Sequence, residues 1–482
     1  MKELADRALN AASMLGATYA DMRVVHRENQ VINAKNALIE GISHNVSKGF
    51  GVRVLVDGAW GFASSSVITP DEVDEITQQA IRIARASVQV KGRPVDLGPP
   101  VAHEDTYVTP VEIDPFEVPI EDKVVVLIAA TRDMKAIDGI VVAQASMECI
   151  REHKWFANSE GAFIEQTIIE TGGGMECTSS GNGDVQKRSY PNSFGRHQGT
   201  AGYEFIEAMD MPGNAERIAQ QAVALLTAKQ CPSGVTTVIL DGTQVALQVH
   251  ESCGHPIELD RVFGTEAAYA GTSFLTTEKL GSFQYGSEHV NITADATLPS
   301  GLGTFGYDDE GVPAQRTPIV RDGIFVGYLT SRETARQLGQ NQSNGTMRAS
   351  GWNRIPLVRM TNVSLEPGNW SLEDLIADTE EGIYMETNKS WSIDDKRLNF
   401  QFGTEIAWEI RDGKLGDMLK NATYTGITPE FWRSCDAVCS GKDWVVWGTP
   451  NCGKGQPPQI AHTGHGAAPA RFRNVQVGVV KS

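Results

Sequence analysis

The amino-acid sequence predicts an α+β protein in which two α+β modules precede a β-rich C-terminal domain. Amphipathic segments alternate with strand-like segments over roughly the first half of the chain. Short strand-like segments, separated by turn signals about every 8 to 12 residues, fill most of the second half. A proline-rich stretch between Pro94 and Pro119 separates the first two modules. We therefore predict domains at residues 1–105, 106–230 and 231–482.

The first module is predicted from a hairpin followed by a helix. Val52 to Val56 alternates apolar residues with others and leads into Asp57-Gly58, a dipeptide typical of two-residue hairpin turns. Thr69 to Glu72 has the pattern of a capping box, with proline at the first helical position. Four apolar residues are expected to share one face of this helix: Val73, Ile76, Ala80 and Ile83.

The middle module and the third domain follow from similar patterns. A helix is predicted from near Pro119, followed by strands between Gly139 and Ile169. "VTTVIL" from Val235 is a short apolar strand, and Asp241-Gly242 is a turn before a helical stretch from Thr243 to His250. The glycine-rich, strand-like remainder predicts a sandwich or a barrel-like domain.

Composition excludes several classes of protein. The net charge of −18 opposes general nucleic-acid binding, because neutralising phosphates requires a basic face. The longest apolar run, Val124–Ala130, is too short to span a membrane, and the N-terminus carries acidic residues too early for a signal peptide. Seven cysteines without framework spacing fit a reducing compartment. We expect a cytoplasmic protein with no nucleic-acid or membrane partner.

The motif His250-Glu251-x-x-x-His255 is one residue longer than the familiar zinc-protease motif. In a regular helix, residues five apart point roughly 140° away from each other, whereas a π-turn aligns them on one face. Gly254 is flexible and Pro256 lacks an N–H group, so the local sequence favours such a break. The motif therefore predicts a distorted helix that can bring two histidines together.

Glu251 would then be able to take a proton from a zinc-bound water without being a ligand itself. The alternative is structural: both histidines bond to core carbonyls and Glu251 faces solvent. A third ligand would favour the zinc site. The residues that could supply it are Glu258, Asp260, Glu266, Cys253 and the distant Cys452.

Other residues of ligand type have plainer interpretations. Cys452 lies in a Gly/Pro-rich stretch that we interpret as a loop able to present a soft ligand. Cys435 and Cys439, four apart and without a second pair, are interpreted as small core residues. His462 and His465 could support the metal ligands, but we favour ordinary loop histidines.

Several long motifs, in order, resemble the TldD/PmbA metallopeptidase family over essentially the whole chain. Near the N-terminus, the segment "GFGVRVLVDGAWGFASS" is similar to the signature of the family's first domain. The C-terminal motifs are "LDGTQVALQVHESCGHPIELDRVFG", "YDDEGVPAQRTPIVRDGIFVGYLTSRETA", "NGTMRASGW", "PLVRMTNVSLEPG" and "TPNCGKGQ". The family's HExxxH motif falls on His250, Glu251 and His255, and its distant zinc-binding cysteine falls on Cys452.

The resemblance implies a β-rich C-terminal metallopeptidase domain and a zinc (Zn2+) enzyme of the catalytic TldD type. Zinc would be held by His250, His255 and Cys452, with Glu251 as the general base. Family members cleave unfolded or leader-type peptides, and they form homodimers, or heterodimers with a PmbA-like subunit, that enclose the active site. An older family label, modulator of DNA gyrase, implies the alternative of a regulatory protein. A catalytically silent peptide-binding protein is a further alternative.

The motif from Tyr307 to Gln315, together with Arg348 and Arg359, is shared with the family but has no certain role. We interpret Gly311 and Pro313 as shaping a turn and Arg359 as the partner of a buried acid. Arg348 or a tyrosine could stabilise the oxyanion of a tetrahedral intermediate, and the sequence does not decide between them.

Overall fold

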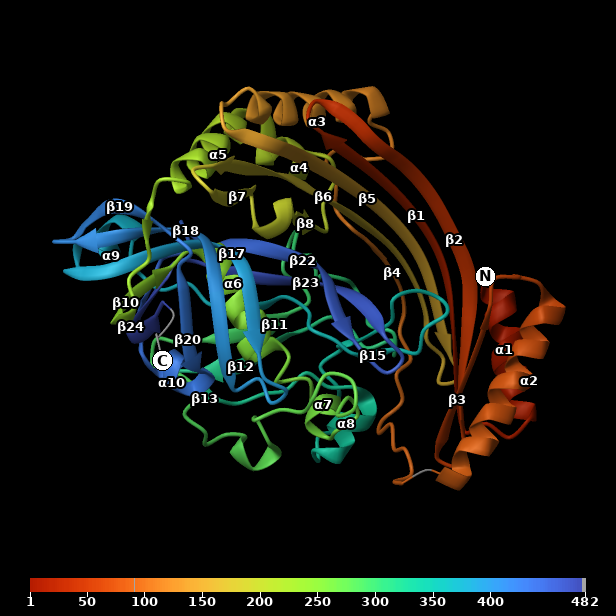
Figure 1. Cartoon of the computed structure of the whole chain (residues 1–482). Helices are drawn as coiled ribbons and strands as arrows, with labels where there is room; N and C mark the ends of the chain where they lie inside the picture. Colours follow the sequence, from red (N-terminus) through yellow and green to blue (C-terminus); the bar gives the residue numbers. More distant parts are fainter. Residues whose placement is uncertain (91, 479–482) are drawn as a thin grey trace.

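A long curved sheet arches over the C-terminal domain in the computed structural model, which describes residues 1–90 and 92–478 (Figure 1). Residues 479–482 of the predicted third domain and residue 91 of the first lie outside the described residues. The sheet has the order β3-β2-β1-β5-β6-β4, and β7 and β8 also pair with β6. Its strands are β1 (Tyr19–Lys35), β2 (Leu38–Val56), β3 (Ala59–Ser65), β4 (Glu104–Val108), β5 (Ile140–Asn158), β6 (Phe163–Gly181), β7 (Asp184–Tyr190) and β8 (His197–Gly199).

Helices cover the convex side of this sheet in two groups (Figure 1). The first group is α1 (Lys2–Met14) and α2 (Pro70–Ser87), and the second is α3 (Ile120–Lys135), α4 (Glu204–Met209) and α5 (Met211–Leu225). Each group packs on its own apolar core, although strands from residues 1–105 and 106–230 share one sheet. We propose that the boundary between the first two domains follows these separate cores rather than the sheet.

Local expectations for the first module hold except in two places. Asp57 and Gly58 form the β2–β3 turn with φ of 47° and 74°, and Thr69 accepts a hydrogen bond from the amide of Glu72. Ile83, however, is exposed, because the helical period places Ala84 on the buried face instead. The proline-rich stretch is also less irregular than predicted, since β4 pairs in parallel with β6 there.

The C-terminal domain is barrel-like, as the turn spacing predicts. Five strands close on themselves through the pairings β17-β10-β24-β20-β18-β17. The strands of this domain are β9 (Lys229–Gln230), β10 (Gly234–Leu240), β11 (Ile292–Asp295), β12 (Arg316–Arg321), β13 (Ile324–Phe325), β14 (Met347–Arg348), β15 (Leu357–Val358), β16 (Val363–Leu365), β17 (Glu381–Ile393), β18 (Asn399–Arg411), β19 (Lys414–Lys420), β20 (Thr423–Ile427), β21 (Cys435–Val438), β22 (Val445–Lys454), β23 (Gln459–Ala467) and β24 (Ala470–Val477).

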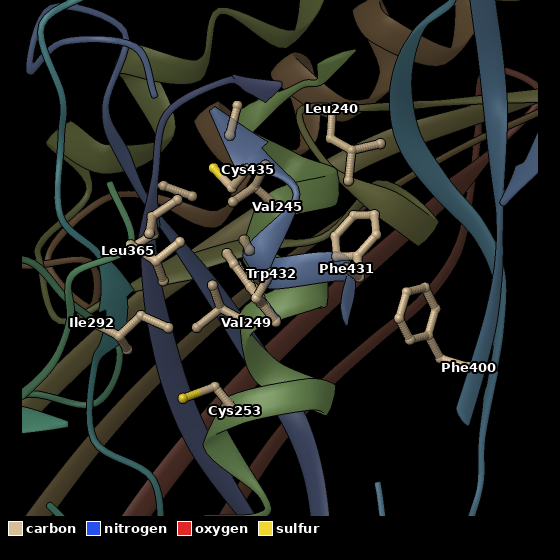
Figure 2. Close-up of a cluster of buried hydrophobic side chains, with 14 of the residues drawn as sticks. Leu240, Val245, Val249, Cys253, Ile292, Leu365, Phe400, Phe431, Trp432 and Cys435 are labelled. Atoms are coloured by element: carbon tan, nitrogen blue, oxygen red, sulfur yellow. The ribbon is translucent and has the colours of Figure 1, made fainter. Parts of the chain in front are cut away.

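One helical segment runs through the core of this domain and positions the site. This segment begins with α6 (Gly242–Val249). The other helices of the domain are α7 (Leu259–Val262), α8 (Arg332–Gln337), α9 (Leu372–Ala377) and α10 (Thr428–Arg433). Short helical turns lie at Val88–Val90, Ser193–Gly195, His250–Gly254 and Thr277–Lys279. Val245, Val249 and Cys253 extend from the segment into the apolar cluster around Trp432 (Figure 2). Among the described residues, no helix has the length and apolarity needed to cross a membrane.

Candidate metal centre

The predicted helix distortion is present at the HExxxH motif. α6 continues into a π-helical turn from His250 to Gly254, and the amide of His255 donates to the carbonyl of His250 at 3.2 Å. This i→i+5 bond places the two imidazoles on the same side, with ring centroids 4.9 Å apart. The extra residue in the motif is therefore accommodated by the π-turn, and the apolar face of α6 stays in the core.

Cys452 reaches the two histidines from a strand, not from the predicted loop. It lies in β22, which pairs with β23 and has a register shift between Thr449 and Cys452. The hairpin packs closely against β8: a Cβ atom at Gly448 would lie only 1.8 Å from the carbonyl oxygen of Gln198. Glycine thus permits the close approach that brings this hairpin over the π-turn.

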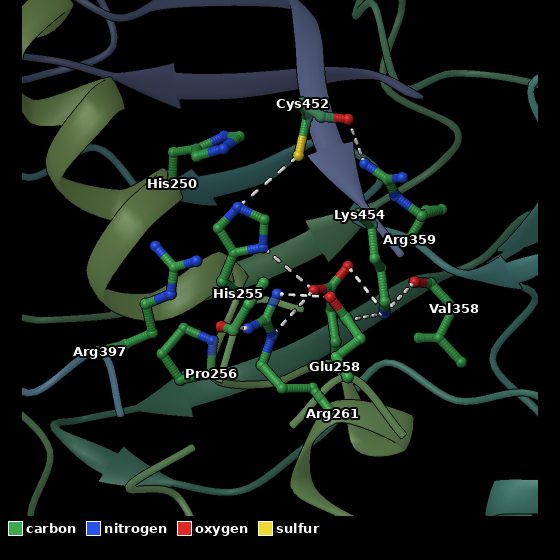
Figure 3. Close-up of polar contacts among 12 residues, drawn as sticks. His250, His255, Pro256, Glu258, Arg261, Val358, Arg359, Arg397, Cys452 and Lys454 are labelled. Atoms are coloured by element: carbon green, nitrogen blue, oxygen red, sulfur yellow. Dashed lines mark hydrogen bonds and ion pairs between the residues drawn. The ribbon is translucent and has the colours of Figure 1, made fainter. Parts of the chain in front are cut away.

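Nitrogen atoms of His250 and His255 and the sulfur of Cys452 lie within 4.8 Å of one another (Figure 3). All three side chains are buried, and the Cys452 Sγ to His255 Nε2 distance is 3.8 Å. They line a cavity of about 320 Å³ that also contains Glu251. Residues from the middle segment, including Phe194, and from the C-terminal domain, including Trp391, complete the cavity wall.

Hydrogen bonds behind each histidine determine which ring nitrogen faces inward. His465 lies 2.9 Å from the carbonyl of Val363 through Nδ1 and 2.7 Å from His250 Nδ1 through Nε2. Because a carbonyl can only accept, His465 carries its proton on Nδ1 and accepts from His250. His250 Nε2 then faces Cys452. Burial would lower the pKa of His250, but Cys452 outweighs burial and raises it, so Nε2 becomes a ligand once a metal displaces its proton. Burial lowers the pKa of His465 well below its ordinary value, which agrees with a neutral ring.

His255 is fixed by a carboxylate instead. Its Nδ1 lies 3.1 Å from Glu258 Oε2, so Nδ1–H donates to Glu258 and Nε2 is left to face Cys452. A carboxylate bonded to an imidazole in this way is a common support for a metal ligand. Glu258 therefore lies on the side of the His255 ring that faces away from Cys452.

The other nearby carboxylates surround the buried amine of Lys454. Asp260 lies 2.8 Å and Glu266 lies 3.2 Å from Lys454 Nζ, and Glu258 lies 3.3 Å from it. Cys253 is fully buried in the apolar core, and burial raises the pKa of its thiol to about 12. Of the five residues considered for the third ligand position, the structure brings Cys452 alone to the two histidines.

Cys452 is electrostatically suited to be a thiolate. Burial would raise the pKa of its thiol, but His250, His255 and Arg359 outweigh burial and hold the pKa well below its ordinary value. Arg359 Nη2 donates to the backbone carbonyl of Cys452 at 2.5 Å. The prediction that Arg359 pairs with a buried acid is wrong, because backbone carbonyls of the β22–β23 hairpin take its place.

Glu251 faces the cavity and has a partner that the sequence did not reveal. Arg397 Nη1 donates to Glu251 Oε2 at 2.6 Å. Burial would raise the pKa of Glu251, but His250, His255 and Arg397 outweigh it and hold the pKa below its ordinary value. The expectation of a solvent-facing glutamate in a purely structural motif is thus wrong, since Glu251 is only 6% exposed.

The remaining predicted residues lie around the site in different ways. Cys435 and Cys439 are buried in apolar clusters, as predicted. His462 and His465 lie in β23 rather than in a loop, and His462 Nδ1 pairs with Glu170 at 2.5 Å. Arg348 donates to the carbonyl of His462 at 2.7 Å and lines a separate cavity of about 310 Å³. Gly311 has a φ of 77° in a turn, as expected.

Family models match three successive segments of the chain. They are described as PmbA/TldA metallopeptidase domain 1 at residues 20–84, the central domain at 113–226 and the C-terminal domain at 233–478. Together these segments cover most of the chain. The protein belongs to the TldD/PmbA family. The HExxxH motif and Cys452 both fall within the match to the C-terminal domain.

Relatives in this family are named as metalloproteases. A metalloprotease of Methanocaldococcus jannaschii is 33% identical over 437 residues, which are 90% of this chain and 92% of its own. A zinc metalloprotease TldD homologue of Saccharolobus solfataricus is 24% identical, over 95% of this chain and 96% of its own.

Solved structures share the fold over the full length. A candidate modulator of a DNA gyrase from Thermotoga maritima has a TM-score of 0.78 at 18% identity, covering 99% of this chain and 100% of its own. TldE of Thermococcus kodakarensis has a TM-score of 0.75 at 16% identity, with the same coverage. At these identities the likeness concerns the fold alone.

Proposed function

We propose that the protein is a zinc-dependent metallopeptidase that hydrolyses peptide bonds in unfolded or leader-type peptides. One observation carries the proposal: the ligand atoms of His250, His255 and Cys452 converge within 4.8 Å beside the carboxylate of Glu251. Catalytic zinc typically has three protein ligands and one open position. The metalloprotease names of the family relatives support the same activity.

The donor set suits zinc. His250 and His255 each turn Nε2 toward Cys452, and the environment of Cys452 favours its thiolate. Metal binding would displace the imidazole protons that stabilise this thiolate. When bound, zinc would polarise a peptide carbonyl and make a coordinated water acidic near neutral pH. This chain's own contribution is to hold the three donors, with His465 and Glu258 fixing the ring orientations.

Glu251 is proposed as the general base. Its carboxylate is ionised, faces the cavity and follows His250 directly in the π-turn. From there it can take a proton from the attacking water and later deliver it to the leaving amine. Glu251→Ala should keep its zinc, because the ligands are untouched, and should lose about 10²- to 10⁴-fold in peptide turnover. Near-full turnover by this variant would refute the assignment.

Cys452 and Cys253 provide a matched pair of variants for the metal assignment. Both cysteines are buried, but Cys253 lies on the core face of the helical segment and is not one of the three converging ligand residues. Cys452→Ala should lose bound zinc and activity with the fold largely intact, whereas Cys253→Ala should retain both. Zinc stoichiometry of the purified proteins is the measurement. Full zinc in the Cys452 variant contradicts the ligand set.

Unfolded or extended peptides are the proposed substrates. The cavity of about 320 Å³ is lined by the middle segment and the C-terminal domain, and it has room for a short part of an extended chain. A folded globular protein should therefore resist cleavage, while the same protein, reduced and alkylated, should be cleaved. Equal cleavage rates for the two forms would contradict this substrate class.

The assembly and location are proposed from the family resemblance and the cysteines. We propose a homodimer, or a heterodimer with a PmbA-like subunit, and a cytoplasmic location. All seven cysteines are free and buried, which fits a reducing compartment. Light scattering at the assay concentration tests the assembly, and an active monomer would contradict it.

The alternative function is a catalytically silent peptide-binding or regulatory protein. It is favoured by the description of structural neighbours, such as that from Thermotoga maritima, as candidate gyrase modulators. A zinc-loaded protein that binds unfolded peptides without cleaving them would support this alternative over the peptidase.

A further inference from the structure

Arg397 extends into the metal-ligand cavity from the turn that joins β17 and β18. Its backbone has a φ of 63°, which is unusual for a residue other than glycine. Two hydrogen bonds hold it there: its amide donates to the carbonyl of Asp394 at 2.8 Å, and Thr428 Oγ1 donates to its carbonyl at 2.9 Å. The backbone is thus fixed in a conformation that aims the side chain at the cavity.

The guanidinium of Arg397 uses little of its hydrogen-bonding capacity. An arginine has five N–H donors, and here Nη1 donates to Glu251. Nε is buried and has no hydrogen-bond partner, and no other described residue accepts from this guanidinium. In Figure 3 the guanidinium points toward the space near His250 and His255. A buried donor without a partner is costly, which suggests that it serves a group absent from the resting protein.

Other residues considered for oxyanion binding are positioned differently. Arg348 lines the separate cavity and donates to the carbonyls of Met360 and His462. Arg359 donates to carbonyls of the β22–β23 hairpin. Arg196 lies exposed at the rim of the cavity, against the ring of Phe194. No tyrosine occurs among the described residues that line the metal-ligand cavity.

We propose that Arg397 is a catalytic residue that binds the oxyanion formed when a peptide carbonyl is attacked. The inference rests on the proposed peptidase function and adds a residue to it. It differs from the sequence-based expectation, which left the choice between Arg348 and a tyrosine open for this role.

The movement of charge during hydrolysis explains why Arg397 would exchange Glu251 for the substrate oxyanion as its partner. The water oxygen bonds to the carbonyl carbon, the C=O electron pair moves to the carbonyl oxygen, and the water proton goes to Glu251. Glu251 becomes neutral as the negative charge appears on the substrate. Arg397 therefore loses its anionic partner as a new one forms nearby. When the C–N bond breaks, the electron pair returns to form C=O and the amine takes the proton from Glu251.

A donor that meets its charge only during reaction should affect kcat more than KM. Arg397→Gln should retain zinc and lose about a hundredfold or more in kcat, with KM changed little. Arg397→Lys should recover part of the loss, because it keeps the charge but not the planar fork. The control is Arg411→Gln, an exposed residue at the other end of β18 that pairs with Glu409, and it should behave as the wild type.

Binding experiments separate direct contact with the oxyanion from an effect exerted through Glu251. The probes are a phosphinic peptide, whose tetrahedral phosphinate is anionic, and a reduced-amide peptide of the same sequence. Both are measured in a Glu251→Gln background by calorimetry. Adding Arg397→Gln should weaken binding of the phosphinic peptide about tenfold or more and leave binding of the reduced-amide peptide nearly unchanged.

Two results would overturn the inference: equal weakening of both peptides, or no weakening of the phosphinic peptide when Glu251 is already substituted. An active Arg397→Gln enzyme with unchanged kcat would overturn it as well, while leaving the peptidase proposal intact. Conversely, a zinc-loaded wild type that cleaves no unfolded peptide would refute the peptidase proposal. The phosphinic peptide would still decide whether Arg397 recognises a tetrahedral anion.

Discussion

Two clusters of three buried carboxylates lie in the C-terminal domain, and they differ in the source of their cations. One consists of Glu258, Asp260 and Glu266, and the other of Asp308, Asp309 and Glu310. In the first, Lys454 of the same domain contacts all three carboxylates. In the second, the cations come from the arching sheet: Lys154 lies 2.8 Å from Asp309, and Arg53 lies 3.5 Å from Glu310.

The two clusters therefore have different structural roles. Lys454 is two residues from Cys452, and Glu258 bonds to His255, so the first cluster links two of the proposed zinc ligands. The second cluster attaches the N-terminal sheet to the C-terminal domain. It also leaves one carboxyl uncompensated: burial and the neighbouring Glu310 raise the pKa of Asp308 from 3.8 to about 8.

Removal of the central cation should have the largest effect. Lys454→Met leaves Asp260 without its cation. Glu258 and Glu266 then keep only Arg261 as a cation among the described residues. We therefore expect a loss of about 3–5 kcal/mol in the free energy of unfolding and loss of zinc. Lys154→Met should cost less, about 1–3 kcal/mol, because Asp309 keeps Arg23 at 3.7 Å and the amide of Ala349. Urea unfolding of both variants tests the ranking. Equal losses would show that the clusters are equivalent.

Substitution of one carboxylate should separate the two roles. Glu258→Gln removes the charge behind His255 and should weaken zinc binding about 10- to 100-fold, with full zinc and activity still reached in excess metal. Asp309→Asn should leave zinc affinity unchanged, because that cluster has no contact with a proposed ligand in the described residues. Competition with a chelating dye measures both affinities. Unchanged zinc affinity in Glu258→Gln would contradict a role for this carboxylate in supporting the metal.

The smallest expected effect per pH unit is a change in the pH dependence of stability. Because the pKa of Asp308 is about 8 in the folded protein and near 3.8 otherwise, the folded state binds an extra proton between these values. The contribution of protonated Asp308 to the free energy of unfolding is complete below about pH 4. It is lost as the pH rises to 8, by at most about 1.4 kcal/mol per pH unit.

Asp308→Asn cannot titrate, so the variant should be less stable than the wild type at pH 4, and this difference should shrink toward pH 8. Asn also loses the acceptor for the amide of Met347, which lowers stability at every pH without changing the slope. Chemical unfolding at several pH values measures the slope. A pH-independent difference between variant and wild type would contradict the raised pKa.

Features that depend on local chemistry could be predicted from the sequence. The Asp57-Gly58 turn, the helix from Ile120 and the barrel-like C-terminal domain follow from turn residues and apolar periodicity. The break at His250–Gly254 follows from the five-residue spacing, with Gly254 and Pro256 beside it. Motif resemblance then singled out Cys452. These features depend on near neighbours in the chain or on long shared motifs.

The contacts that complete the site depend on tertiary packing. His465 lies 215 residues from its partner His250, and Arg397 lies 146 residues from Glu251, so no local pattern connects them. Glu258, close to the motif in sequence, turned out to support His255 instead of joining the cluster, because Lys454 holds it on the far side of the ring. Long-range charge pairing and close backbone packing determine these positions, and neither is encoded in the spacing of residues along one segment.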